Sequence, residues 1–114
     1  MDILVTNNPL IMAQYQGDAK IDFLDTDLLG VLIYIRDHIH RGHRLLTHPL
    51  SGSVKPNENI YKSVLITGAP EKPDIQSITM IEECILTVQK FPKREIPEKY
   101  LKDMQTVDFS LISK

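Results

Sequence analysis

The 114-residue chain has no tryptophan, a single cysteine (Cys84) and no long apolar run. One cysteine excludes an intrachain disulfide, as is typical of proteins in a reducing compartment. A transmembrane helix needs about 20 consecutive apolar residues, so no membrane span is expected. The N-terminal stretch MDILVTNNP carries an acid and only a short apolar run, unlike a signal peptide or an anchor. We therefore expect a cytoplasmic protein.

The chain also has no excess of positively charged residues. The formal net charge is −2, so the chain as a whole has no electrostatic reason to bind nucleic acid or acidic lipid. The charge is nevertheless unevenly spread, because residues 36–62 hold five bases, two acids and all four histidines. This segment predicts an electropositive part of the surface, with a solvated helix end and loop as the ordinary alternative.

Short apolar stretches alternate with helical patterns along the chain, and the length suits one domain. This alternation predicts an α/β fold in three layers: a mostly parallel four- to five-stranded sheet with helices on both faces, Rossmann- or flavodoxin-like in outline. The predicted strands cover residues 3–5, 20–24, 45–47 and 63–67, and the predicted helices cover 9–16, 28–40 and 74–90.

Polar and glycine residues mark the ends of the predicted helices. Asn8 precedes Pro9, and Asp27 and Asp74 precede the second and third helices, so each can cap a helix start. Gly42 follows the second helix and suits its C-terminal end. The sequence therefore predicts well-delimited helices.

The composition changes after residue 91, which divides the chain into an α/β domain, 1–91, and a C-terminal extension, 92–114. A short helix is predicted at 97–104. Residues 107–111 alternate like an edge strand, or form a tail that docks on a neighbouring subunit. Apolar side chains in this tail, such as Phe109, need burial, so a homodimer is one expectation.

Three predicted strands end alike, in VTNNP, LLTHP and LITGAP. If the strands are parallel, their carboxyl ends share one rim, where ligands of open α/β sheets bind. The fifteen residues between Thr47 and Ser63 are mostly polar or turn-forming, and loops of that length are usually functional or disordered. The candidate ligand-binding residues are Thr6, Asn7, Asn8, Thr47, His48, Ser51, Gly52, Ser53, Lys55 and Asn57, with Thr67 at the third strand end.

This composition suits a small anion. Ser51, Gly52 and Ser53 offer hydroxyls and backbone N–H groups, and Lys55 supplies charge. No GxGxxG or Walker A motif is present, so no nucleotide cofactor is expected. The alternative is that these residues only form turns.

The histidine spacing does not favour a metal site. His38 and His40 point to nearly opposite sides of a helix, and Gly42 interrupts the helix between His40 and His43. No carboxylate or cysteine completes a set with zinc-ligand spacing. We therefore expect no bound metal.

His48 is the one candidate catalytic residue, because it follows a strand end and histidine titrates near neutral pH. One hypothesis is a small enzyme with His48 as acid/base and with Asn7, Ser51 and Lys55 holding an anionic substrate. The alternative is that the His48 ring fixes the loop by a hydrogen bond. Cys84, beside two glutamates, is interpreted as a packing residue.

Two blocks, ILVTNNPL at residues 3–10 and GHRLLTHPLSGSVKPNENIYKSVLI at 42–66, resemble the GrdX family. Members are small proteins encoded in the glycine, sarcosine and betaine reductase gene clusters of amino-acid-fermenting anaerobic bacteria. The resemblance implies a non-catalytic accessory protein of that metabolism, with a reductase component or a small anionic ligand as its partner. It implies no catalytic residue.

Overall fold

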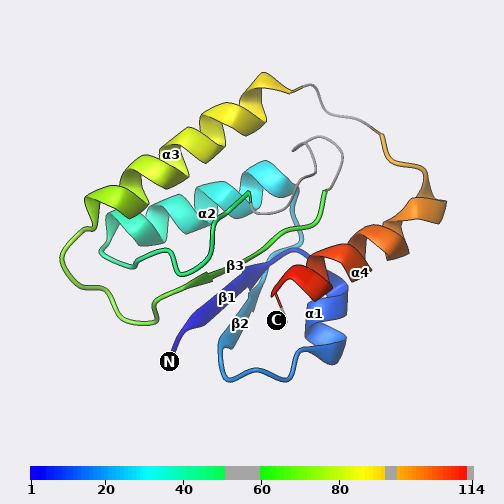
Figure 1. Ribbon diagram of the computed structural model, residues 1–114, viewed down its shortest axis with the longest axis horizontal. Helices are drawn as coiled ribbons and strands as arrows, with labels where there is room; N and C mark the ends of the chain where they lie inside the picture. Colours follow the sequence, from blue (N-terminus) through cyan, green and yellow to red (C-terminus); the bar gives the residue numbers. More distant parts are fainter. Residues whose placement is uncertain (51–59, 92–94, 113–114) are drawn as a thin grey trace.

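The computed structural model describes residues 1–50, 60–91 and 95–112. It is a small α/β domain in which α2 and α3 lie on one side of a sheet and α1 and α4 on the other (Figure 1). In chain order the elements are β1 (Ile3–Thr6), α1 (Pro9–Gln14), β2 (Lys20–Phe23), α2 (Leu28–His40), β3 (Ser63–Ile66), α3 (Ile75–Lys90), a 3-10 helix (Glu98–Tyr100) and α4 (Leu101–Ile112).

The sheet has three strands in the order β2-β1-β3. β1 pairs with β2 in parallel and with β3 antiparallel, so that Ile3 lies opposite Lys20 on one side and Ile66 on the other. The predicted mostly parallel sheet of four to five strands, with its Rossmann- or flavodoxin-like outline, is therefore wrong. The predicted strand at 45–47 is reduced to an isolated bridge between Leu45 and Ile66.

The segment 44–47 runs along β3 as an irregular outer edge. The Thr67 N–H donates to the Arg44 carbonyl at 2.9 Å, and the Leu46 N–H donates to the Leu65 carbonyl at 2.8 Å. Parallel neighbours need a crossover connection, usually a helix, whereas a loop connection leaves them antiparallel. Among the described residues no helix lies between Thr47 and β3, and the chain returns as an antiparallel β3.

The predicted caps at the starts of α1, α2 and α3 and the predicted stop at Gly42 are confirmed, although α1 ends at Gln14 rather than at residue 16. Asn8, Asp27 and Asp74 cap α1, α2 and α3, and each side chain accepts a backbone N–H of the first turn, at 3.0, 2.8 and 3.0 Å. Gly42, two residues beyond the last residue of α2, has a φ of 113°. Only glycine adopts this left-handed conformation readily, and a Cβ there would meet the backbone of Glu71.

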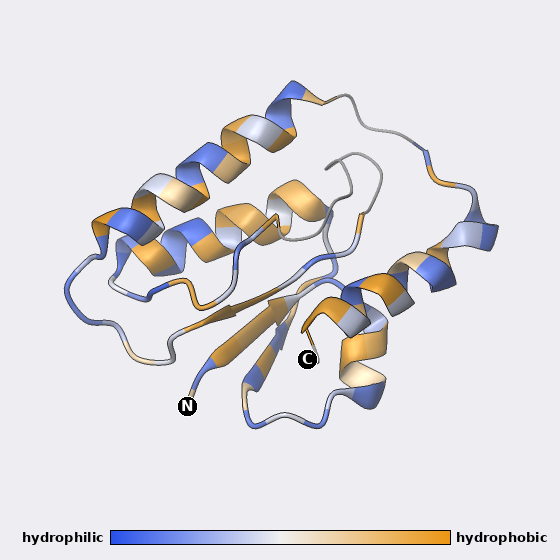
Figure 2. Ribbon diagram, in the orientation of Figure 1, coloured by the Kyte–Doolittle hydropathy of each residue, from blue (hydrophilic) through white to orange (hydrophobic). Residues whose placement is uncertain are grey.

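The apolar core lies between the sheet and the α2–α3 pair. Alternate residues of β1 and β3 face it, and Figure 2 shows β1 apolar along its length. Cys84 belongs to this core, as predicted. Its buried members are Ile3, Val5, Leu28, Val31, Leu32, Ile35, Ile39, Val64, Ile66, Ile81, Cys84 and Ile85.

Residues 107–111 lie inside the helix α4, so the edge-strand alternative is wrong. Their alternation is outweighed by a helical spacing that runs through Leu101, Met104, Asp108 and Ile112, one face of a helix. α4 packs on α1 and β3, on the side of the sheet opposite the core. The division of the chain at residue 91 stays a prediction.

Candidate functional site

Thr6, Asn7 and Asn8 lie at the carboxyl end of β1, and Ser63 lies beside Thr6 at the start of β3. We call these four residues the rim. Their exposed fractions are 0%, 7%, 0% and 5%, so all four are buried. Because β3 is antiparallel to β1, the rim contains the first residue of β3, and Thr67 lies beyond the opposite end of the strand pair. The predicted gathering of three strand ends is therefore wrong for Thr67.

The rim holds a carboxylate, that of Asp108 from α4. The Ser63 N–H donates to Asp108 Oδ1 at 3.0 Å, and the Ser63 hydroxyl donates to Oδ2 at 2.6 Å. The Asn8 amide, Nδ2, also donates to Oδ2 at 3.0 Å. Asp108 is only 2% exposed. We call the three donor groups of Asn8 and Ser63 the carboxylate site.

A chain of hydrogen bonds supports the carboxylate site from β1. The Asn8 N–H donates to Thr6 Oγ1 at 2.9 Å, and the Thr6 and Ser63 hydroxyls are 2.7 Å apart. Since the Ser63 hydroxyl donates to the carboxylate, the Thr6 hydroxyl donates to Ser63. Bonds aligned in this way polarise one another, so the Ser63 hydroxyl is oriented as a donor before any anion arrives.

Lys62, next to Ser63, adds positive charge near the site. The residue is buried, and burial lowers the pKa of its ammonium group below the ordinary value of 10.5, while the charge of Asp108 opposes that shift. The charge of Asp108 therefore favours the protonated form of Lys62. A second anion in place of Asp108 would receive the same attraction.

Asn7 has a structural role at the rim. Its Nδ2 donates to the carbonyls of Thr26 and Ile60, at 3.0 and 2.8 Å, and its Oδ1 accepts the Lys62 N–H at 2.9 Å. One side chain thus ties β1 to the segments that precede α2 and β3. These bonds occupy the amide, so Asn7 positions the rim and does not face a ligand.

The remaining predicted residues lie elsewhere. Thr47 accepts the Leu65 N–H on its hydroxyl at 3.0 Å, beside the middle of β3 and away from the rim. The exposed His48 accepts the Leu50 N–H on Nδ1 at 3.0 Å, the loop-fixing role that was the alternative to catalysis. Outside the described residues lie Ser51, Gly52, Ser53, Lys55 and Asn57.

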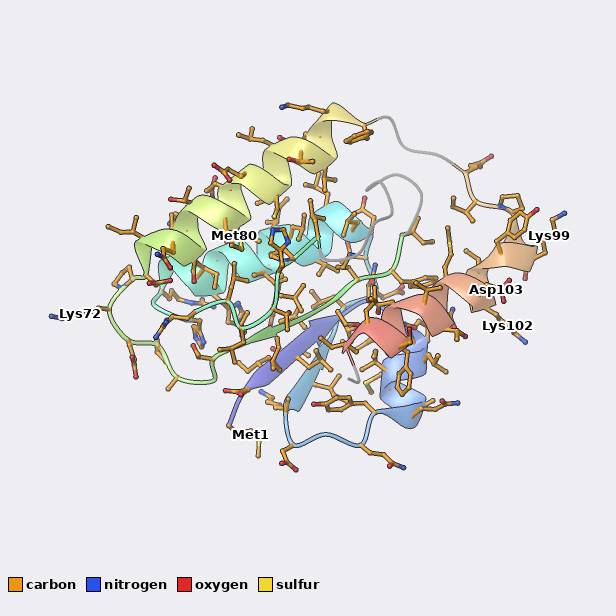
Figure 3. The ribbon with its side chains drawn as sticks, viewed as in Figure 1. Met1, Lys72, Met80, Lys99, Lys102 and Asp103 are labelled. Carbon is orange, nitrogen blue, oxygen red and sulfur yellow. The ribbon has the colours of Figure 1, made fainter. Side chains whose placement is uncertain are left out.

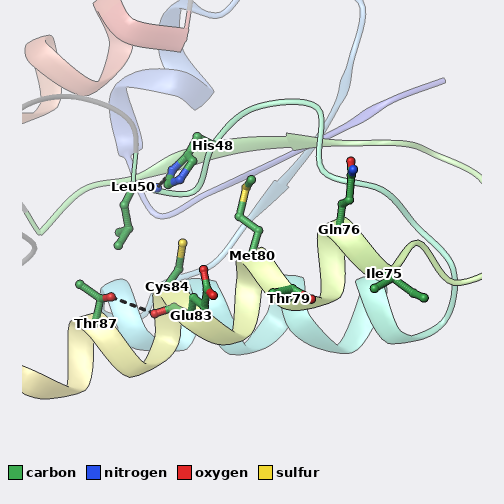
Figure 4. A pocket seen from close by; sticks show the side chains of 9 residues that line it. All are labelled: His48, Leu50, Ile75, Gln76, Thr79, Met80, Glu83, Cys84 and Thr87. Atoms are coloured by element: carbon green, nitrogen blue, oxygen red, sulfur yellow. Dashed lines mark hydrogen bonds between the residues drawn. The ribbon is translucent and has the colours of Figure 1, made fainter.

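His48 also borders a groove along α3 (Figure 4). The groove has a volume of about 500 Å³, and a second hollow of about 220 Å³ shares His48, Gln76 and Met80 with it. Other side chains around the larger hollow include Leu50, Glu83, Cys84 and Thr87. None of the rim residues lines either hollow, so His48 and the carboxylate site belong to different surfaces.

The thiol of Cys84 is poorly suited to catalysis. It is 4% exposed, and burial raises its pKa to about 11, with a further contribution from the charge of Glu83. The thiolate is the reactive form of cysteine, so a redox or nucleophilic role is disfavoured for the only cysteine of the chain.

We expect Cys84 to react with a thiol reagent such as DTNB at least about 100-fold more slowly in the native protein than in the urea-unfolded chain at pH 8, because less thiolate forms and the residue is only 4% exposed. Stopped-flow absorbance on both states measures this ratio, and the unfolded chain serves as the control for intrinsic reactivity. Equal rates would show that the folded structure does not shield the thiol.

The other histidines are held by local contacts. The Nδ1–H groups of His38 and His43 donate to the carbonyls of Tyr34 and Thr67, at 3.0 and 2.6 Å, and their rings meet edge to face at 5.1 Å. His40 lies 3.3 Å from the Glu82 carboxylate. Within the described part of the chain, no three histidine, cysteine or acidic side chains are grouped as metal ligands.

The sequence interpretation missed Ser63 and Asp108, the two residues at the centre of the site. Asp108 carried a usable signal, since it is the one charged residue on the helical face formed with Leu101, Met104 and Ile112. An isolated acid on an otherwise apolar helix face needs a buried partner. Nothing in the local sequence marks Ser63, because its partner is 45 residues away.

Among residues 1–50, 60–91 and 95–112, no helix combines the length and the apolar character required to cross a bilayer.

Comparison with known proteins agrees with the resemblance found in the sequence. Neither the curated proteins nor the solved structures yield a match to this chain. The family model described as GrdX-like protein matches residues 3–114, which is almost the full length. The chain therefore belongs to the GrdX-like family.

Proposed function

We propose that this chain is a non-catalytic accessory protein of the glycine, sarcosine and betaine reductase systems, and that it binds a carboxylate group at the rim. Membership of the GrdX-like family supports the association with these systems. The observation that carries the binding proposal is the convergence of three donors, from Ser63 and Asn8, on one carboxylate. Charge-assisted hydrogen bonds of this kind are stronger than neutral ones.

The ligand class follows from the chemistry of the donors. Glycine, sarcosine and betaine differ at nitrogen and share a carboxylate, the group that the three donors and the charge of Lys62 suit. An acidic side chain of a reductase component presents the same group. A non-catalytic role is supported by Cys84, whose buried thiol has a raised pKa, and by His48, whose Nδ1 is occupied and which lies away from the rim.

The test combines thermal shift with pull-down. We expect millimolar glycine, sarcosine or betaine, or a reductase subunit, to raise the Tm of the full chain, because ligands that bind only the folded state stabilise it. Acetyl phosphate, which carries no carboxylate, should give no such shift. Ser63→Ala, which removes one of the three donors, should lose at least half of that shift. Ser110→Ala, an exposed serine on α4, is the matched control. No shift with any ligand together with no association with any subunit contradicts the proposal.

A further inference from the structure

The helix α4 is attached to the rest of the molecule differently from α2 and α3. Its one buried residue is Asp108, whereas α2 buries Leu28, Val31, Leu32, Ile35 and Ile39. No residue of Leu101–Ile112 belongs to the apolar core. Val107 and Leu111 are 44% and 37% exposed. α4 itself thus contributes a charged group, and no apolar side chain, to the buried residues.

The polar contacts of α4 with the body meet at the same place. Besides its bond to Asp108, the Asn8 amide donates to the Gln105 carbonyl at 2.9 Å, one turn earlier in the helix. The Gln105 amide donates to the Tyr61 hydroxyl at 3.0 Å. These contacts, like those of Asp108, are made with the rim or with the residues that lead into it.

An element with few buried apolar side chains opens at a lower free energy than the core does. For α4 that opening would separate Asp108 from Ser63 and Asn8 together. The three donors of Ser63 and Asn8 would then face solvent as a preformed set. Thr6 would still orient the Ser63 hydroxyl, because it belongs to β1.

We propose that α4 is a releasable cover and that Asp108 is an internal competitor for the carboxylate site. The inference rests on the proposed function and adds its regulation: a carboxylate ligand gains the site only when α4 leaves it. Apparent affinity is then reduced by the fraction of molecules in which α4 is released. The occupant of the released site is a small molecule carrying a carboxylate, which replaces Asp108 on the donors of Ser63 and Asn8.

Hydrogen exchange of the unaltered chain tests whether α4 is releasable. We expect amides of Leu101–Ile112 to exchange through an opening populated at least about 100-fold more than the opening that exposes the amides of α2 and α3. Mass spectrometry of peptides from α3 and α4 in one sample provides the internal comparison. Equal protection of the two helices, with both exchanging only by global unfolding, overturns the proposal.

Acetate binding tests the competition. We expect Asp108→Ala in the full chain to bind acetate at least about tenfold more tightly than the unaltered chain, because the internal competitor is gone. Asp103→Ala removes an exposed acid from the same helix (Figure 3) and should leave the affinity unchanged. NMR titration locates the binding through the Ser63 and Asn8 signals, with phosphate as a second probe to separate carboxylate binding from general anion binding.

The outcomes separate this inference from the proposed function. Equal acetate affinity of the unaltered chain and Asp108→Ala overturns the competition and leaves binding at the rim intact. No acetate binding by any folded variant contradicts both. If Asp108→Ala does not fold, the exchange measurement on the unaltered chain still decides whether α4 opens independently.

Discussion

Asp108→Ala should lower the free energy of unfolding by about 3 kcal/mol, the range expected when a buried charge is removed from its hydrogen-bond donors. Three donors, two from Ser63 and one from Asn8, lose the carboxylate that accepts them. Lys62 loses the negative charge that favours its protonated form. A domain of this size is stable by only about 5–15 kcal/mol, so the loss is a large share.

The size of the loss also has an upper limit. Once α4 separates from the rim, water can satisfy the donors, so the cost cannot exceed the free energy that holds α4 in place. Urea unfolding followed by circular dichroism measures the change in stability. Hydrogen exchange of α4 in the variant distinguishes release of the helix from unfolding of the core.

Asp103→Ala is the matched control, because it removes the same charge from an exposed position in the first turn of α4. An acid there interacts with the helix dipole, so its loss should cost less than about 1 kcal/mol. Similar stability changes for Asp103→Ala and Asp108→Ala would show that the contacts of Asp108 with the rim contribute little.

Asn7→Asp should destabilise the fold by at least about 3 kcal/mol at pH 7, although it changes only one group of atoms. The Asn7 Nδ2 faces the carbonyls of Thr26 and Ile60, at 3.0 and 2.8 Å. A carboxylate oxygen in its place would set negative charge against two carbonyl oxygens in a buried position. The Oδ1 position, which accepts the Lys62 N–H, would be unaffected.

The pH dependence identifies the mechanism. The carboxyl group introduced by Asn7→Asp can donate one hydrogen bond when it is protonated, so the variant should recover stability relative to the unaltered chain as the pH falls below the range where that carboxyl ionises. Asn7→Ala, which lacks all three bonds, is the control and should show no such recovery. Urea unfolding at pH 7 and pH 4 for the three proteins gives the comparison. A parallel response of Asn7→Asp and Asn7→Ala to pH would argue against the charge as the cause.

Of the two residues in these predictions, the sequence pattern indicated Asn7 as a candidate site residue but did not indicate Asp108. Asn7 was a candidate because it follows a strand, and the structure places it at the rim as a positioning residue. Asp108 was not a candidate, because residues 107–111 were interpreted as an edge strand or a docking tail. Polar and apolar residues alternate over the five residues 107–111, which is typical of a strand, whereas the twelve residues 101–112 have the apolar spacing of a helix. The structure shows that the longer, helical pattern is the correct one.

The sequence by itself determined the local structure around the rim. Ile3–Val5 form a buried strand, Asn8 caps the helix that begins at Pro9, and Gly42 takes the left-handed conformation beyond α2. Each depends on neighbours within a few residues, through backbone sterics, capping or burial of a short apolar run. The same stretches, ILVTNNPL and the block that begins at Gly42, also carried the resemblance to the GrdX family.

Only the tertiary structure decided the direction of β3 and the partner of the rim. Ser63–Ile66 reads equally well as a parallel or an antiparallel strand, since either pairing uses the same backbone groups and buries the same side chains. In the folded structure β3 pairs antiparallel to β1, which brings Ser63 beside Thr6. The contact between Asp108 and Ser63, which are 45 residues apart in the sequence, depends on where α4 packs. Local propensities do not determine such a contact. The carboxylate site is therefore a product of the fold, built from residues whose neighbours in sequence predict strand, cap and helix.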